Sequence, residues 1–177
     1  MAACEADWGR EEDGGRRLLQ ATIRDRDNRE YDLVVLDETD THYHVFVVHR
    51  RKGIGQAQCP IDDQAGVLTI ANIEIFAEVA ANRPCLLWFI PWRIWKRLTA
   101  RRYRGRGLGS ALLEHVIAYA RSRGLKRIVG QVVAHDLAQS SWLPQWYARH
   151  GFQVVRINAE AAGRTAVCIS LDLLGSK

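Results

Sequence analysis

The sequence predicts a mixed α/β domain of the α+β type, in which a central, mostly antiparallel sheet is flanked by helices. Two patterns predict this class. Short runs of β-branched and aromatic residues separated by turn residues fill the first half of the chain, and a strongly amphipathic helix followed by alternating strand and helix patterns fills the second. A length of 177 residues fits one domain with a full-sized core. We expect residues 1–16 to be a flexible lead-in and residues 17–177 to form the domain.

Strand patterns dominate the first half. Two short apolar candidates, Leu18–Arg24 and Tyr31–Leu36, are separated by a polar, turn-like stretch. Arg51-Lys52-Gly53 predicts a hairpin turn, because glycine supplies the positive φ that such a turn needs. Three strands around this turn and a second one at residues 62–66 are expected to form an antiparallel meander: Tyr43–Val48, Ile54–Cys59 and Val67–Phe76.

The best helix in the chain is expected at Leu108–Arg123. Leu112, Val116 and Ala120 recur at a spacing of four residues and form an apolar stripe, which is typical of a helix packed against a core. Gly124 is a suitable C-terminal stop. The remaining expected elements are a strand at Arg127–Val133, a helix at Trp142–His150 with Pro144 in its first turn, and strands at Phe152–Ile157 and Ala166–Leu173 joined by a turn around Ala162-Gly163.

Composition excludes several classes of protein. An apolar fraction of 47% and a charged fraction of 25% are ordinary for a globular protein. No stretch approaches the roughly 18 uncharged apolar residues of a membrane span. Residues 1–20 mix acidic and basic side chains, unlike a secretory signal. We therefore expect a cytoplasmic protein without a transmembrane segment.

The four cysteines do not form a recognisable framework. Cys4, Cys59, Cys85 and Cys168 are far apart, and none is part of a Cys-x-x-Cys pair. Disulfide scaffolds and zinc sites both depend on clustered or regularly spaced cysteines. We therefore expect free thiols and no metal.

A basic block occupies residues 93–106. It contains seven arginine and lysine residues and no acidic one. Such a block attracts polyanions, and a phosphorylated cofactor, a nucleic acid and an anionic membrane surface all fit that description. Taken alone, the block is read as a solvated positive face.

The strongest functional signal is the segment Tyr103–Ser110, which lies directly before the predicted helix at Leu108. Three alternating glycines leave its backbone uncovered, so a ligand can approach closely. The first N–H groups of a helix have no internal partner and carry a partial positive charge that suits a diphosphate. The dinucleotide pattern Gly-x-Gly-x-x-Gly and the Walker pattern both fail here.

This segment resembles motif A of the GNAT (GCN5-related N-acetyltransferase) superfamily, Gln/Arg-x-x-Gly-x-Gly/Ala. Arg104-Gly105-Arg106-Gly107-Leu108-Gly109 matches every fixed position. A second segment, Trp146–Phe152, resembles the end of the family's motif B, Leu-Tyr-Glu-Lys-x-Gly-Phe. The two motifs stand in the family's order, and the resemblance covers roughly residues 43–174.

The resemblance implies a GNAT fold and an N-acetyltransferase that uses acetyl-coenzyme A as co-substrate. The pantetheine arm would lie where the strand Val67–Phe76 and the strand Arg127–Val133 splay apart. Backbone N–H groups near Ile75 and Phe76 would polarise the thioester carbonyl. The residues that it implies for contact with the cofactor are Ile75, Phe76, Arg104, Gly105, Arg106, Gly107, Leu108, Gly109, Ser110 and Ser140. Ser140 stands where the family often has asparagine, and Ser141 is an alternative for that contact.

The same resemblance implies direct attack by a neutral amine. Tyr147 is the candidate general acid for the coenzyme A thiolate, because a phenol is protonated at neutral pH. Glu74 is the default general base. Glu78, His135 and Asp136 remain rivals, as does a chain of water molecules.

One departure from the family is an insertion of about 27 residues, from Ala77 to Tyr103. It contains three of the six tryptophans next to the basic block, and Arg93–Ala100 is a short helix candidate. The insertion must leave a strand end and return beside the cofactor site. A flap over the acceptor pocket, a packed appendage, and a homodimer or membrane-surface contact all stay open for it.

The acceptor is an amine on a small molecule or a protein, and the sequence does not choose between them. Two alternatives of other classes are a coenzyme A-binding sensor or interaction module without turnover and an acetyltransferase acting on an RNA-linked amine through the basic block. We do not expect nucleic acid as the partner, because the cofactor phosphates already account for the nearest arginines.

Overall fold

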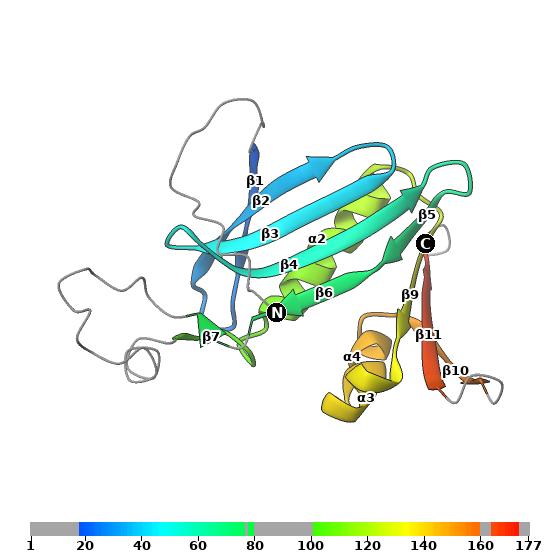
Figure 1. The fold of residues 1–177 in the computed structure, drawn as a ribbon. Coiled ribbons are helices and arrows are strands. Elements are labelled where there is room, and N and C mark those ends of the chain that lie inside the picture. Colours follow the sequence, from blue (N-terminus) through cyan, green and yellow to red (C-terminus); the bar gives the residue numbers. More distant parts are fainter. Residues whose placement is uncertain (1–17, 77, 80–100, 160–163, 174–177) are drawn as a thin grey trace. The chain divides into compact units, whose positions relative to one another are not determined.

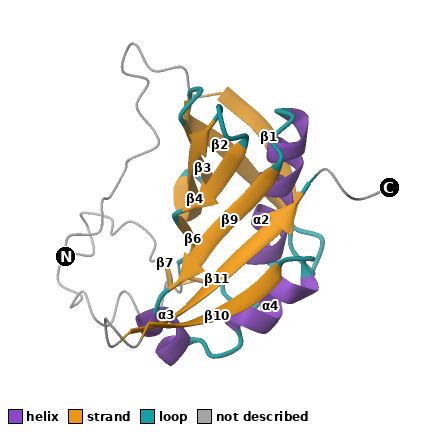
Figure 2. Cartoon of the chain, turned by 90° about the vertical axis from the view of Figure 1, so that its right-hand side faces the viewer, coloured by secondary structure: helices purple, strands orange, loops and turns teal. Residues whose placement is uncertain are grey.

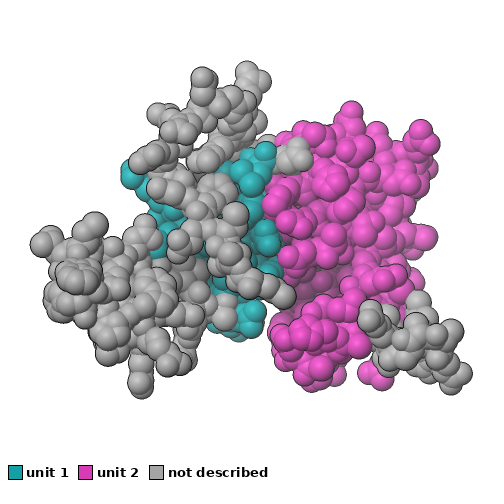
Figure 3. Space-filling view, viewed as in Figure 1, with its two compact units in different colours: residues 1–36, 45–56, 74–112 teal, residues 37–44, 57–73, 113–177 magenta. Residues whose placement is uncertain are grey.

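The computed structural model describes residues 18–76, 78–79, 101–159 and 164–173 (Figure 1). These residues divide into two compact units (Figure 3). The first unit comprises the described parts of 1–36, 45–56 and 74–112. The second comprises the described parts of 37–44, 57–73 and 113–177.

The fold is mixed α/β, with a large, mostly antiparallel sheet flanked by helices, as the sequence predicted (Figure 2). The strands are β1 (Leu18–Arg24), β2 (Glu30–Glu38), β3 (His42–His49), β4 (Lys52–Asp62), β5 (Val67–Ile70), β6 (Asn72–Ile75), β7 (Glu78–Val79), β8 (Arg101–Arg102), β9 (Arg127–Val132), β10 (Gln153–Ala159) and β11 (Arg164–Asp172). The helices are α2 (Leu108–Ser122), α3 (Ala134–Gln139) and α4 (Leu143–Arg149).

In the first unit the strands follow the order β1-β2-β3-β4, with β6 beside β4. Alternating residues of these strands are buried, as expected for a sheet with one face on a core. The buried side chains of this unit include Tyr31, Leu33, Val45, Val47, Ile54, Leu108 and Leu112. Each such aliphatic or aromatic side chain contributes about 1.5–3 kcal/mol on burial.

In the second unit the order is β4-β5-β9-β11-β10. β5 and β9 pair in parallel, whereas β9, β11 and β10 pair antiparallel. The C-terminal part of α2 covers this sheet with the apolar stripe that the sequence predicted. Its core includes Leu68, Leu113, Val116, Ala120, Ile128, Val132, Phe152 and Ile169. Gly124 adopts a φ of 70° and ends α2 as expected.

The predicted hairpin turn after β3 is displaced by one to two residues. Arg50 and Arg51 have φ values of 52° and 64°, whereas Gly53 lies within β4. A two-residue turn between antiparallel strands needs positive φ at both central residues. The pairing of β3 with β4 therefore places two arginines in the left-handed region, and glycine is not used there.

Two further differences concern single elements. The predicted strand Val67–Phe76 is divided at Ala71 into β5 and β6. Helix α3 has no counterpart in the prediction, because none of its residues is buried and its sequence shows no apolar stripe. The other strands and helices predicted for the described residues are observed with shifts of a few residues at their ends.

β7 and β8 show where the inserted segment begins and ends. Glu78 pairs with Arg102 and Val79 with Arg101 in an antiparallel ribbon. The chain therefore leaves β6 and returns to the glycine loop along two short paired strands, which the sequence did not predict. The short helix expected at Arg93–Ala100 and the turn expected around Ala162-Gly163 lie outside the described residues. Within the described part of the chain, no helix has both the length and the apolar character that crossing a membrane requires.

Candidate active site

The glycine loop before α2 has the geometry of an uncovered helix start. Gly105 and Gly107 adopt φ values of 80° and 86°, which side chains other than glycine rarely allow. The first helical hydrogen bond runs from the Ala111 N–H to the Gly107 carbonyl, at 3.1 Å. The N–H groups of Leu108 and Gly109 precede this bond, so the helix offers them no acceptor. Their partial positive charge makes this point of the loop a suitable place for an anion.

The start of α2 is held in place by its own sequence. Leu108 is 1% exposed and anchors the first turn in the core. The first turn contains no acidic residue, so no carboxylate of the helix itself competes for the N-terminal amides. A Cβ placed on Gly105 meets no described atom within 4 Å, which leaves room beside the loop for a ligand.

Arg104 connects the loop to the end of β6. Its Nε donates a hydrogen bond to the Ile75 carbonyl at 3.0 Å, and its Nη2 lies 3.9 Å from Oε1 of Glu74. The structure therefore brings together three of the residues that the sequence singled out. It also turns the Arg104 guanidinium toward the protein.

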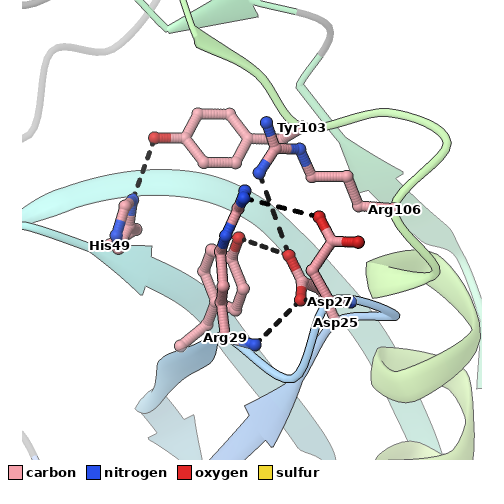
Figure 4. Close-up of polar contacts among 7 residues, drawn as sticks. Asp25, Asp27, Arg29, His49, Tyr103 and Arg106 are labelled. Carbon is pink, nitrogen blue, oxygen red and sulfur yellow. Dashed lines mark hydrogen bonds and ion pairs between the residues drawn. The ribbon is translucent and has the colours of Figure 1, made fainter.

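Arg106 connects the same loop to the turn between β1 and β2. Its Nη1 lies 3.9 Å from Oδ2 of Asp25, and its guanidinium carbon lies 6.0 Å from the centre of the Tyr103 ring (Figure 4). Its carbonyl accepts a hydrogen bond from the Arg26 N–H at 2.9 Å. Both loop arginines thus have a carboxylate partner within the first unit.

A β-bulge interrupts the pairing with β4 between Ala71 and Phe76. The Ala71 N–H donates to the Gln58 carbonyl at 3.0 Å, and the Phe76 N–H donates to the Ile54 carbonyl at 2.9 Å. From Ala71 to Phe76 the chain advances by five residues, whereas from Gln58 to Ile54 the facing strand β4 advances by four. One extra residue is therefore inserted between these two bonds. A bulge of this kind redirects the backbone groups that follow it.

The bulge distinguishes the two amides predicted to polarise the thioester. The Phe76 N–H is directed at β4 and already has an acceptor in Ile54. Successive amides of a strand point to opposite edges, so the Ile75 N–H points away from β4. The parallel pairing of β5 with β9 ends at Ile70 and Gly130. Of the two predicted amides, the geometry therefore favours the one of Ile75.

Tyr147 lies in α4, within the second unit. It is 5% exposed and packs edge-on against Trp146 and Phe152, with ring centres 4.7 and 5.4 Å away. Burial, with smaller contributions from Cys59 and Asp136, raises the pKa of Tyr147 to about 12. The phenol is therefore a proton donor, not an acceptor of protons, at neutral pH.

The end of α4 explains why glycine and phenylalanine follow this tyrosine. Gly151 has a φ of 87° and terminates the helix. The Phe152 N–H then donates to the Tyr147 carbonyl at 3.2 Å, so the chain turns back and the two rings make contact. The motif therefore folds as a helix end that buries its tyrosine.

The other predicted residues are placed as follows. Ser140 ends α3, is half-buried, and donates its N–H to the Asp136 carbonyl at 2.8 Å. Asp136 and His135 are exposed on α3, and the His135 Nε2 lies 2.8 Å from the Gln139 Nε2. Glu78 lies in β7. Ser140 and Tyr147 belong to the second unit, whereas the glycine loop and Glu74–Phe76 belong to the first.

The sequence interpretation missed Asp25 and Tyr31. It placed Asp25 in a polar turn and Tyr31 at the start of a strand, although Asp25-Arg26-Asp27-Asn28 is a recognisable turn signal in which the first aspartate accepts backbone bonds. Here Asp25 Oδ1 accepts the N–H groups of Asp27 and Arg29, both at 2.9 Å. The signal pointed to a turn, but not to its contact with the glycine loop.

Comparisons with known proteins agree with this geometry. The acetyltransferase (GNAT) family model matches residues 85–157, a range that contains the glycine loop, α2 and Tyr147. A search of curated proteins by sequence found no match.

Three solved structures share the fold. A protein described as a GNAT-family acetyltransferase from Desulfovibrio desulfuricans aligns with a TM-score of 0.53 and 18% identity, over 75% of this chain and 69% of that one. The ribosomal-protein-S18-alanine N-acetyltransferase of Escherichia coli aligns at 0.51 and 19%, over 79% and 74%. A protein described as a streptothricin acetyltransferase from Bacillus anthracis, solved with acetyl coenzyme A, aligns at 0.50 and 13%, over 76% and 64%.

The family match covers both motifs that carried the resemblance, and the structural similarity extends over most of the chain. Residues 85–157 of the chain therefore match the acetyltransferase (GNAT) family, and the chain shares its fold with solved acetyltransferases of that kind.

Proposed function

We propose that the protein transfers the acetyl group of acetyl-coenzyme A to an amine by direct attack, with Tyr147 as general acid. The observation that carries this proposal is the glycine loop with two left-handed glycines at the start of α2, inside the matched family region. The rest of the mechanism follows from the groups around that loop and around α4.

The loop would hold the cofactor by its diphosphate. The amides of Leu108 and Gly109 present N–H groups at the positive end of α2, where an anion gains up to about 2 kcal/mol in favourable geometry. The residues proposed to contact the cofactor at this loop are Arg104, Gly105, Arg106, Gly107, Leu108, Gly109 and Ser110. Because the two arginines already have carboxylate partners, the backbone amides would carry most of the contact.

The end of β6 would polarise the thioester. The Ile75 N–H points away from β4, and the Arg104 bond to the Ile75 carbonyl fixes the same peptide edge. An amide donor directed at the carbonyl oxygen stabilises the negative charge that develops when an amine attacks. We also propose that Ser140, which belongs to the second unit, contacts the cofactor.

Tyr147 would protonate the departing thiolate. A coenzyme A thiol has a pKa of about 8.5, below that of the buried phenol, so Tyr147 would give up its proton only as the carbon–sulfur bond breaks, and the tyrosinate would then regain a proton from solvent. The burial that raises the pKa of Tyr147 to about 12 keeps that proton on the hydroxyl until the thiolate forms.

Glu74 remains the proposed general base. It stands one residue before Ile75 on β6, next to the amide proposed for the thioester, and it is half-exposed. Its carboxylate is 3.9 Å from Arg104, so deprotonation of the amine would have to compete with that ion pair. A variant of Glu74 that keeps its activity would exclude Glu74 as the base. The alternatives are then Glu78, His135, Asp136 and a chain of water molecules.

The acceptor class is tested with a panel of amines. The panel should contain peptides with free N-termini, since one protein of similar fold is named for an alanine of a ribosomal protein, and small amines, since another is described as acting on streptothricin. Release of free thiol from acetyl-coenzyme A is followed for each member.

The result expected is transfer to at least one amine class together with measurable affinity for coenzyme A. Binding without transfer across the whole panel would favour the coenzyme A sensor instead. Absence of coenzyme A binding in calorimetry would overturn the proposal altogether.

A further inference from the structure

Asp25 is the one buried charged residue among those that the structure describes. It is 7% exposed and lies in the turn between β1 and β2, with a side chain that has no exposed surface. A carboxylate without water is costly unless donors surround it. The burial of this carboxylate in a turn is explained by the donors that surround it.

Backbone N–H groups, a phenol and a guanidinium surround the Asp25 carboxylate. The N–H groups of Asp27 and Arg29 bind Oδ1 at 2.9 Å each. The Tyr31 hydroxyl binds Oδ2 at 2.9 Å, and the Arg106 guanidinium approaches the same oxygen at 3.9 Å (Figure 4). Burial opposes ionisation, but the bonds from Arg29, Tyr31 and Asp27 outweigh it, and the pKa of Asp25 is lowered.

Arg106 is the point where this turn meets the glycine loop. Its carbonyl accepts the Arg26 N–H at 2.9 Å, next to the ion pair with Asp25. A Cβ placed on Gly107 would lie 3.0 Å from the Arg26 Cγ, so the turn also packs directly on the loop. The loop therefore has three separate contacts with the turn.

The Arg106 guanidinium lies over the ring of Tyr103 at 6.0 Å, and its side chain is 33% exposed. Tyr103 is 4% exposed, lies under the guanidinium, and its hydroxyl is 3.0 Å from the His49 Nδ1 (Figure 4). Tyr31 packs against both of these rings, with centroid distances of 5.0 Å to His49 and 6.3 Å to Tyr103. The ring of Tyr103 and the carboxylate of Asp25 thus both approach the same guanidinium, which links the loop to the turn.

We infer that Asp25 is a positioning residue for the cofactor loop. By holding Arg106 from inside the protein, it keeps the backbone between Gly105 and Gly109 in the conformation that presents the amides of α2. Asp25 would act through Arg106 without touching the cofactor. The inference rests on the proposed function, since it assumes that this loop binds a diphosphate.

The test is a double-mutant cycle on coenzyme A affinity, measured by calorimetry. Asp25→Asn keeps the shape of the side chain but removes its charge, and we expect the Kd for coenzyme A to rise about ten-fold or more, because the Arg106 guanidinium loses the carboxylate that it approaches at 3.9 Å. Arg106→Met removes the partner. If Asp25 acts through Arg106, Asp25→Asn produces less than a two-fold further change in the Arg106→Met background.

Asp27→Asn is the matched control. It removes a carboxylate of the same turn whose side chain is 60% exposed and pairs only at the surface, with Arg29 at 3.5 Å. We expect a Kd within two-fold of the wild type. Should Asp25→Asn fail to fold in circular dichroism, Tyr31→Phe replaces it, because it removes one bond to Asp25 while keeping the packed ring, and a Kd about three-fold higher is expected.

The measurements distinguish failure of this inference from failure of the proposed function. A wild-type Kd unchanged by Asp25→Asn, or effects of the two variants that simply add, would overturn the inference and leave the proposed function intact. Wild-type protein that does not bind coenzyme A would overturn the proposed function itself. Non-additive loss of affinity in folded variants supports the inference.

Discussion

The Nε of Arg104 donates a hydrogen bond of 3.0 Å to the carbonyl of Ile75, and this bond joins the glycine loop to the end of β6. The two residues are far apart in the sequence, and each belongs to a different part of the proposed site. A single side chain thus connects the segment expected to hold the diphosphate with the residue whose N–H is expected to polarise the thioester.

Arg104→Met should therefore impair both steps. We expect kcat/KM for acetyl-coenzyme A to fall about 10- to 100-fold, because the planar Nε–H bond and the positive charge are both lost. Arg104→Lys is the matched variant, since it restores the charge without the guanidinium geometry. Full recovery by lysine would contradict a role for the bond to Ile75.

Tyr147→Phe isolates the proposed general acid. The ring keeps its contacts with Trp146 and Phe152, so folding should be nearly normal, while the donor to the thiolate is lost. We expect kcat to fall on the order of 10²–10⁴-fold, with the Kd for coenzyme A within about two-fold of the wild type. Steady-state kinetics and calorimetry measure the two quantities, and an unchanged kcat removes this role from Tyr147.

The two left-handed glycines of the loop should respond differently to alanine. Gly107→Ala places a Cβ 3.0 Å from the Arg26 Cγ in addition to the strain of a φ of 86°. Gly105→Ala has comparable strain, with a φ of 80°, but meets no described atom within 4 Å. The free energy of unfolding should fall by about 1–2 kcal/mol for Gly105→Ala and by more for Gly107→Ala.

Urea unfolding of both variants and the wild type measures this difference. Equal losses would show that the contact with Arg26 adds nothing to the backbone strain, and would weaken the packing of the β1–β2 turn on the loop.

His115 should make stability depend on pH. Burial lowers the pKa of His115, whose Nε2 lies 2.8 Å from the hydroxyl of Tyr43. The unfolded chain then binds more protons than the folded one below about pH 6.5, so stability is complete above that value and decreases as the pH falls toward the folded pKa. Burial likewise raises the pKa of Tyr43, so this hydroxyl stays protonated throughout that range.

His115→Gln removes the titrating group but keeps a polar partner for Tyr43. Urea unfolding at pH 7, 6 and 5 should show a smaller decrease of stability with falling pH in the variant than in the wild type. The same slope in both proteins would falsify the assignment to His115.

Local patterns in the sequence were sufficient for much of the fold and for the two motifs. The apolar stripe of α2, the glycines that start and end it, and the tyrosine before Gly151 all act within a few residues of one another. Their structures follow from backbone sterics and helix geometry, which neighbouring residues determine. Helix α3 escaped prediction because it buries nothing, so no periodic apolar signal exists for it.

The sequence by itself determined that a glycine loop precedes a helix and that a tyrosine stands near the end of another. Only the tertiary structure decided which groups these elements meet. The bulge that selects Ile75 over Phe76 depends on how β6 pairs with β4, and the partners of Arg104 and Arg106 come from distant strands and turns. Contacts between residues remote in the chain leave no local pattern, because they depend on how the whole sheet is assembled.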